Sequence, residues 1–122
     1  MKESLQTRLK EQNERPITDQ MQHRWIKQFA SAAAWLEQLD YFHGDMRPGN
    51  ILLDGSGHVK LCDFGNTTKR GEELPATTYP YYRLRVDRSS PLAGPASEQF
   101  AMGSCIYTIR TGHEPLDHLK RP

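Results

Sequence analysis

Three oxygen-bearing side chains, Asp45, Asn50 and Asp63, stand at spacings that suit a reaction on phosphate. Asn50 follows Asp45 by five residues, and Asp63 comes after two short apolar runs joined by a Gly-Ser-Gly triplet at 55–57. A Mg²⁺ ion takes one or two protein oxygens together with phosphate oxygens, and a separate carboxylate is needed to orient a hydroxyl nucleophile. The spacing is therefore typical of Mg²⁺-assisted chemistry on phosphate.

A β-hairpin is the element that must bring these groups together. The apolar runs end at Asp54 and begin again at His58, and such runs around a three-residue loop predict a hairpin. Pairing Asp54 with His58 places Asn50 opposite Cys62, so Asn50 and Asp63 leave the same end of the hairpin. The competing interpretation is a glycine-rich hairpin with solvated acidic residues, but solvated turns need no Asp/Asn spacing of this kind.

The same residues resemble those of a known family. The segment 43–50, HGDMRPGN, resembles the catalytic loop of protein kinases, and the triplet 63–65, DFG, resembles their metal-binding triplet. The resemblance implies ATP and Mg²⁺ as cofactors and a protein or peptide hydroxyl as substrate. It implies Asp45 as the residue that accepts or orients the hydroxyl, and Asn50 and Asp63 as ligands of the metal that holds ATP. Arg47 stands where Ser/Thr kinases carry a Lys, and it keeps the charge on a wider planar group.

Two positions depart from the family pattern. Gly44 replaces an Arg that usually holds a phosphorylated activation loop, so the usual phosphorylation switch at residues such as Thr67, Thr68, Thr77, Thr78 and Tyr79 is not expected. Glu98 replaces the Asp that usually braces the catalytic loop, and the Ala-Pro-Glu before it is not recognisable.

Two alternatives to an active protein kinase stay open. A non-catalytic kinase-like binding module is favoured by these departures. A small-molecule kinase of the aminoglycoside or choline type is suggested by the His-Gly-Asp and Pro-Gly-Asn sequences at 43–50. The basic residue at Arg47 and the long segment after the DFG triplet argue against that second alternative.

Helical periodicity predicts the scaffold around the loop. Residues 1–15 are polar apart from a few positions such as Leu5 and Leu9, and they predict a short surface helix or a frayed tail. Thr18 is an expected N-cap for a helix from Asp19 to Leu39. Its apolar stripe, together with both tryptophans of this helix, is expected in the core. The stripe and the second tryptophan are Met21, Trp25, Phe29, Ala33, Leu36, Leu39 and Trp35.

The second half of the chain contains a long aperiodic segment and one apolar helix. Residues 66–95 show no periodicity and, by resemblance, form the activation and substrate-docking segment. Arg83, Arg85 and Arg88 are either a basic patch that favours an acidic peptide or part of a solvated loop, and both interpretations stay open. Residues 98–111 predict a mostly buried helix that ends at Gly112 as a C-cap.

Length and composition limit the remaining possibilities. The 122 residues allow one domain, and a net charge of +1 gives no general case for nucleic acid or an anionic membrane as partner. Cys62 and Cys105 in apolar runs, without a secretory segment, predict a reducing intracellular, cytoplasmic setting and no disulfide. We expect an α+β, mainly α fold: a tail at 1–18, then a partial kinase-like C-lobe at 19–122 without an N-lobe, poorly active or inactive by itself.

Overall fold

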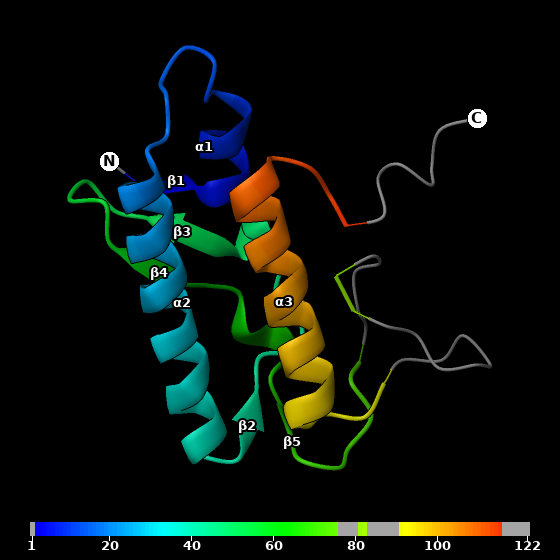
Figure 1. The fold of residues 1–122 in the computed structure, drawn as a ribbon. Coiled ribbons are helices and arrows are strands. Elements are labelled where there is room, and N and C mark those ends of the chain that lie inside the picture. Colours follow the sequence, from blue (N-terminus) through cyan, green and yellow to red (C-terminus); the bar gives the residue numbers. More distant parts are fainter. Residues whose placement is uncertain (1, 76–80, 83–90, 116–122) are drawn as a thin grey trace, which may run out of the picture.

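The structure is a computed structural model that describes residues 2–75, 81–82 and 91–115. Two long helices, α2 (Asp19–Gln38) and α3 (Pro95–Thr111), run side by side in opposite directions, and short strands lie beside them (Figure 1). The fold therefore mixes helices and strands. The sequence predictions made for Thr77, Thr78, Tyr79, Arg83, Arg85 and Arg88 concern residues that lie outside the described ranges.

Helix α2 begins and packs largely as its periodicity predicts. The Thr18 hydroxyl accepts a hydrogen bond from the Met21 backbone N–H at 3.1 Å, which confirms the N-cap. Trp25 and Phe29 are buried on the face toward the core. The prediction of a core position for Trp35 is wrong, because 62% of this side chain is exposed. Trp35 follows Ala33 by two residues, which turns it to the opposite side of the helix.

The C-terminal end of the apolar stripe on α2 is also more exposed than predicted. Leu36 is buried, whereas half of the Leu39 side chain is exposed. Leu39 is the C-cap residue and no longer belongs to the helix. The periodicity of a helix therefore ceases to predict burial at this position.

Helix α3 begins at Pro95, three residues earlier than predicted, and ends at Gly112 as predicted. Gly112 has a φ of 78°, and its N–H donates to the Thr108 carbonyl oxygen at 2.8 Å. Ala101, Cys105 and Ile109 are buried against the core, whereas Phe100 and Tyr107 are 42% and 45% exposed. The prediction of a mostly buried helix is therefore wrong, because only one side of α3 faces the core of the described residues. The buried Gln22 of α2 donates from Nε2 to the Ile109 carbonyl at 3.1 Å, which ties the two helices together.

The predicted hairpin is present with its predicted register. Strand β3 (Ile51–Leu53) pairs antiparallel with β4 (Val59–Leu61), and Asn50 and Asp54 lie opposite Cys62 and His58. The Asp54 carboxylate accepts hydrogen bonds from the backbone N–H groups of Ser56 and His58 at 2.8 and 2.9 Å. Gly57 has a φ of 79°, which the turn requires and which glycine adopts without strain.

The N-terminal residues form regular structure. Strand β1 (Glu3–Ser4) pairs antiparallel with β3, and α1 (Leu5–Lys10) follows with Ser4 as its N-cap. Of the two predicted forms, a short surface helix or a frayed tail, the helix is present. It is not only a surface helix, because Leu5 and Leu9 are buried in the same hydrophobic core as α2 and α3. The buried Arg8 guanidinium donates at 2.7 Å to the Arg15 carbonyl and holds the loop after α1.

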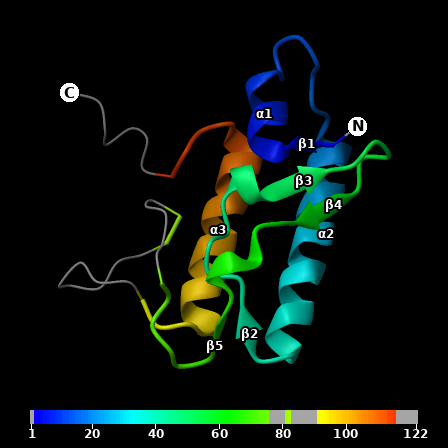
Figure 2. The ribbon, with the colours of Figure 1, turned by 180° about the vertical axis from the view of Figure 1, so that it is seen from behind.

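Figure 2 shows from behind that the sheet of β1, β3 and β4 lies beside the first half of α2. Strand β4 is an outer strand of this sheet, since the strand order is β1-β3-β4. The side chain of Gln28 on α2 reaches this strand, and its Oε1 accepts a hydrogen bond from the Val59 N–H at 2.7 Å. The helix and the hairpin are thereby joined at the sheet edge.

A second small sheet closes the other end of the molecule. Strand β2 (Tyr41–Phe42) pairs antiparallel with β5 (Thr68–Lys69), and an isolated bridge joins Glu73 with Leu92. The segment predicted to be without structure therefore contains a strand and a bridge. Strand β5 is only two residues long, so it is too short to produce a periodic pattern. Among the residues that the structure describes, no helix combines the length and the apolar character that a membrane crossing needs.

Candidate active site

A closed ring of hydrogen bonds joins the loop before β3 to the end of β4. The amide Nδ2 of Asn50 donates to the carboxylate Oδ2 of Asp45 at 3.0 Å and to its backbone carbonyl at 2.9 Å. The Asp45 N–H donates to Nδ1 of His43 at 3.1 Å, and His43 Nε2 is 2.8 Å from the Cys62 carbonyl oxygen. The Cys62 N–H donates to the Asn50 carbonyl at 3.0 Å and completes the ring.

This ring fixes the orientation of His43 and, through it, of the loop. Because Nδ1 of the His43 imidazole accepts from the Asp45 N–H, the imidazole hydrogen is on Nε2, which donates it to the Cys62 carbonyl. Both nitrogens are occupied, and the side chain is fully buried. His43 is therefore a positioning residue.

Asp63 follows the ring directly and has an unusual backbone. Its φ and ψ are 59° and 72°, a left-handed conformation that costs non-glycine residues free energy and is found often at functional sites. Its side chain is exposed. The next residue, Phe64, packs edge-on to the His43 ring with centroids 5.2 Å apart. Asp63 thus follows directly after Cys62, whose N–H is bonded to the Asn50 carbonyl at the end of the hairpin.

Arg47 lies against Asp45. Its Nε is 3.4 Å from Asp45 Oδ1, an ion pair between side chains that are 35% and 15% exposed. This Nε is buried and has no hydrogen bond of good geometry, so the contact is mainly electrostatic. The structure therefore brings Asp45, Arg47 and Asn50 into mutual contact.

The oxygen groups at this end of the hairpin fit a Mg²⁺ ion that is held mainly by phosphate. The Asn50 amide nitrogen points to Asp45, which leaves its oxygen Oδ1 on the other branch of the side chain as an acceptor. Asp63 supplies an exposed carboxylate. Within the described ranges, no cluster of three His, Cys, Asp or Glu side chains forms a metal cage. Two hard oxygen ligands are what Mg²⁺ takes when phosphates and water complete its shell.

The buried carboxylate of Glu98 braces the loop backbone from α3. It accepts hydrogen bonds from the N–H of His43 and, at 3.4 Å, from the N–H of Gly44. The longer side chain of Glu98 therefore makes the contacts that the family resemblance assigns to an Asp. Sequence reasoning did not identify the third partner, Tyr82, whose hydroxyl donates to Glu98 at 2.9 Å and accepts from the Met46 N–H at 2.9 Å. Its one sequence signal is an aromatic residue within a polar segment.

Gly44 is tightly enclosed. Its φ is 82°, and a Cβ there would lie 2.5 Å from the Asn66 carbonyl oxygen and 3.0 Å from Leu74 Cδ2. A distance of 2.5 Å to a backbone atom requires the backbone to move. Position 44, where protein kinases usually carry Arg, therefore has no space for a side chain in this structure.

Cys62 is only half-buried, although it lies in an apolar run. Partial burial and the neighbouring Asp63 carboxylate raise the pKa of its thiol. Cys105 is fully buried in α3, and burial raises the pKa of this thiol as well. Both cysteines are free thiols.

Comparison with known proteins identifies relatives of this chain. The sequence model of the protein kinase domain matches residues 1–121. Sperm motility kinase 3A of Mus musculus is 35% identical over 96 residues, which are 75% of this chain and 19% of that protein. Serine/threonine-protein kinase MRCK beta of Homo sapiens is 27% identical over 110 residues, which are 82% of this chain and 6% of that protein. The chain thus spans a fifth or less of the length of these curated relatives.

The matched region includes every residue of the hydrogen-bonded ring and the brace from Glu98. The resemblance of the 43–50 loop and the DFG triplet to protein kinases is confirmed by a match that continues through both long helices. The chain belongs to the eukaryotic-type protein kinase domain family.

Proposed function

We propose that this domain takes part in the transfer of a phosphoryl group from ATP to a Ser or Thr hydroxyl of a protein, with Mg²⁺ as cofactor. The observation that carries the proposal is the closed ring of hydrogen bonds that fixes Asp45 and Asn50 at the hairpin end from which Asp63 emerges. Phosphoryl transfer depends mainly on positioning and charge neutralisation, and a rigid ring supplies positioning.

Asp45 is the group that orients the acceptor hydroxyl. One carboxylate oxygen, Oδ2, accepts from Asn50, and the other, Oδ1, lies in the ion pair with Arg47. The carboxylate is therefore fixed in direction and remains 15% exposed toward a substrate. When the hydroxyl oxygen forms its bond to phosphorus and the bond to ADP breaks, the hydroxyl proton passes to this carboxylate.

Arg47 supplies positive charge beside the transferred group. Its guanidinium is always protonated and presents several donors, so it balances the negative charge of the phosphoryl oxygens. Asn50 and Asp63 are the residues that would hold Mg²⁺, which supplies charge neutralisation on the ATP phosphates when bound.

A non-catalytic kinase-like binding module is the second candidate function. Gly44 favours it, because the enclosed glycine leaves no place for a cation that would hold a phosphorylated loop. We further propose that the polypeptide of residues 1–122 has little or no activity by itself. The matched relatives carry the names of protein kinases, so the comparisons give no support to the aminoglycoside or choline alternative.

The test is calorimetric titration of ATP into the protein with and without Mg²⁺. We expect Mg²⁺-dependent binding that Asp63→Asn abolishes. The matched control is Asp54→Asn, which removes the same charge at the opposite end of the same hairpin. Equal binding without Mg²⁺, or unchanged binding in Asp63→Asn, contradicts the proposed metal site. Mg²⁺-dependent binding without phosphoryl transfer to Ser/Thr peptides by the full-length protein supports the binding module.

A further inference from the structure

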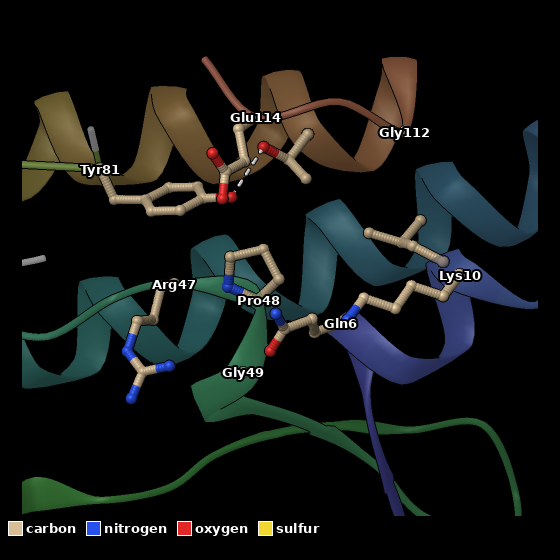
Figure 3. Close-up of a pocket in the computed structure, with 10 residues that line it drawn as sticks. Gln6, Lys10, Arg47, Pro48, Gly49, Tyr81, Gly112 and Glu114 are labelled. Atoms are coloured by element: carbon tan, nitrogen blue, oxygen red, sulfur yellow. Dashed lines mark hydrogen bonds between the residues drawn. The ribbon is translucent and has the colours of Figure 1, made fainter. Parts of the chain in front are cut away.

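A pocket of about 220 Å³ lies next to the 43–50 loop (Figure 3). Three parts of the chain that are distant in sequence form it: α1, the loop residues after Asp45, and the C-terminal end of α3. The side chains that matter for its chemistry are Gln6, Lys10, Arg47, Thr108 and Glu114. No residue assigned above to Mg²⁺ lines it, and Arg47, which is assigned above to the phosphoryl group, lines it from the side of the 43–50 loop.

The pocket adjoins the position of the acceptor hydroxyl. Arg47 lines the pocket and at the same time lies 3.4 Å from the carboxylate of Asp45. An extended peptide advances about 3.4 Å per residue, so a residue about two or three positions from an acceptor at Asp45 can reach the pocket.

The volume limits the occupant. Pockets for drug-sized ligands and nucleotides are roughly 300–1,000 Å³, which is larger than this one. A volume of about 220 Å³ instead accommodates one amino-acid side chain with its backbone at the opening. The pocket is therefore too small to be the nucleotide site.

The charges favour an anionic occupant. Lys10 is exposed and makes no ion pair with any residue in the described ranges, and Arg47 has a buried Nε without a hydrogen bond. Arg47 is paired with Asp45, and Glu114 also lines the pocket, so Lys10 is the cation that is open to an acidic occupant. Thr108 adds a neutral hydroxyl that is bonded to the Tyr81 hydroxyl at 3.3 Å. An acidic side chain would find an unpaired cation here, whereas a basic one would face two cations.

A glycine keeps the pocket open next to Arg47. A Cβ at Gly49 would lie 2.8 Å from Arg47 Nη1 and 3.0 Å from Gln6 Oε1. Any side chain at this position would therefore displace the ends of both neighbours. Without one, Arg47 and Gln6 converge above the glycine, and the guanidinium contributes to both the pocket and the Asp45 ion pair.

We propose that this pocket selects protein substrates that carry an Asp or Glu within three residues of the phosphorylated Ser or Thr, with Lys10 and Arg47 as the recognition residues. The proposal rests on the proposed function, because it takes Asp45 as the position of the acceptor. It assigns to α1 a part in substrate choice.

The test measures peptide binding, which does not require turnover. Fluorescence anisotropy is recorded for labelled peptides with a central Ser, in which a single Asp, Ala or Arg is moved through three positions on either side. At one or more positions we expect Asp to bind about fivefold tighter than Ala, and Arg to bind more weakly than Ala. Raising the salt concentration should reduce both differences, since the contact is partly exposed.

Variants at Lys10 assign the preference to the pocket. Lys10→Gln should abolish most of the preference for Asp, and Lys10→Glu should reverse it in favour of Arg. The control is Lys27→Glu, which makes the same charge change on the exposed side of α2 and should keep the preference. Circular dichroism of each variant verifies that α1 and the rest of the fold are intact.

Three results would overturn the proposal: no preference for Asp at any position, no peptide binding, or a preference that Lys10→Gln and Lys10→Glu leave unchanged. None of these results affects the Mg²⁺-dependent ATP binding that tests the proposed function. Conversely, loss of the metal site in the calorimetric test leaves the measured charge preference of the pocket as it is.

Discussion

The Tyr82 hydroxyl donates a hydrogen bond of 2.9 Å to Oε1 of Glu98. The same hydroxyl accepts from the Met46 N–H at 2.9 Å, and Glu98 accepts from two further N–H groups of the 43–50 loop. One buried side chain from the segment before α3 therefore connects that helix to the loop. The loop that carries Asp45 is held by side chains that are far away in the sequence.

Tyr82→Phe removes this connection without changing the shape of the core. We expect the free energy of unfolding to fall by about 1.5–3 kcal/mol, because a buried hydrogen bond to a carboxylate is lost and the Met46 N–H loses its acceptor. Urea unfolding measures the change. The control is Tyr81→Phe, whose hydroxyl makes a longer bond of 3.3 Å to the neutral Thr108. If Tyr81→Phe lowers the free energy of unfolding as much as Tyr82→Phe or more, the Tyr82 hydroxyl does not brace the 43–50 loop.

Gly44→Ala tests whether the loop has space for a side chain. The left-handed backbone alone costs alanine about 1–2 kcal/mol, and the close approach to the Asn66 carbonyl adds to this cost. The matched control is Gly71→Ala, because Gly71 has a similar φ of 85° and no atom within 4 Å of its Cβ position. We expect thermal unfolding to show a clearly larger loss for Gly44→Ala. Equal losses of stability in the two variants would show that the Asn66 and Leu74 atoms around Gly44 can move aside at no cost in free energy.

The turn of the hairpin should respond to acid. The N–H groups of His58 and Ser56 donate to the Asp54 carboxylate, and the His58 contact is the main cause that lowers its pKa. Because the folded pKa is below the unfolded one, the contribution to stability is present above the ordinary Asp value of about 3.9 and is lost as the pH falls through the folded pKa.

NMR titration checks this expectation. The amide signals of Ser56 and His58 should shift together at a pH below the ordinary Asp value. In Asp54→Asn the side-chain oxygen remains an acceptor but does not titrate, so the joint shift should disappear. A joint shift that persists in the variant would assign the titration to another group.

Alkaline pH should destabilise the protein through two buried groups. Burial is the main cause that raises the pKa of Tyr82 and of Cys105 above their ordinary values. The unfolded chain loses these protons at about pH 8.5 for Cys and about pH 10 for Tyr, while the folded chain keeps them. Stability is therefore complete below about pH 8.5 and falls above it, by up to about 1.4 kcal/mol per pH unit for each group.

Denaturant unfolding between pH 8 and 10 measures this slope. Cys105→Ala removes the first of the two groups, and the slope between pH 8.5 and 10 should become shallower. The half-buried Cys62 gives the comparison, because Cys62→Ala should change the slope less than Cys105→Ala. The reverse order would contradict the burial argument.

The hairpin and the two long helices could be predicted because their signals are local. The register around Asp54 follows from a glycine-containing loop and alternating runs, and the N-cap at Thr18 follows from one side chain. Asn50 and Asp63 were placed at the same hairpin end on this basis, and the hydrogen bond from the Cys62 N–H to Asn50 agrees with that placement. Their roles as metal ligands stay predictions.

The remaining features depend on contacts between distant segments. The hydroxyl of Tyr82 has its role only because α3 brings Glu98 beside the loop, and nothing in the local sequence indicates this. The exposure of Trp35 follows from its angular position on the helix and not from its residue type. The pocket cannot be predicted locally, because the polar residues around Lys10 give no indication that α1 packs beside the loop.

The contact between Gln28 and Val59 has a consequence for the behaviour of the protein at high concentration. An outer strand offers its backbone donors to any other chain that can extend the sheet, and this is a route to aggregation. Here the Gln28 amide oxygen on α2 accepts a hydrogen bond from one of these donors, the Val59 N–H. The exposed Lys60, between Val59 and Leu61, places a charge on the same strand. The helix that positions the hairpin thus also protects it from intermolecular strand pairing.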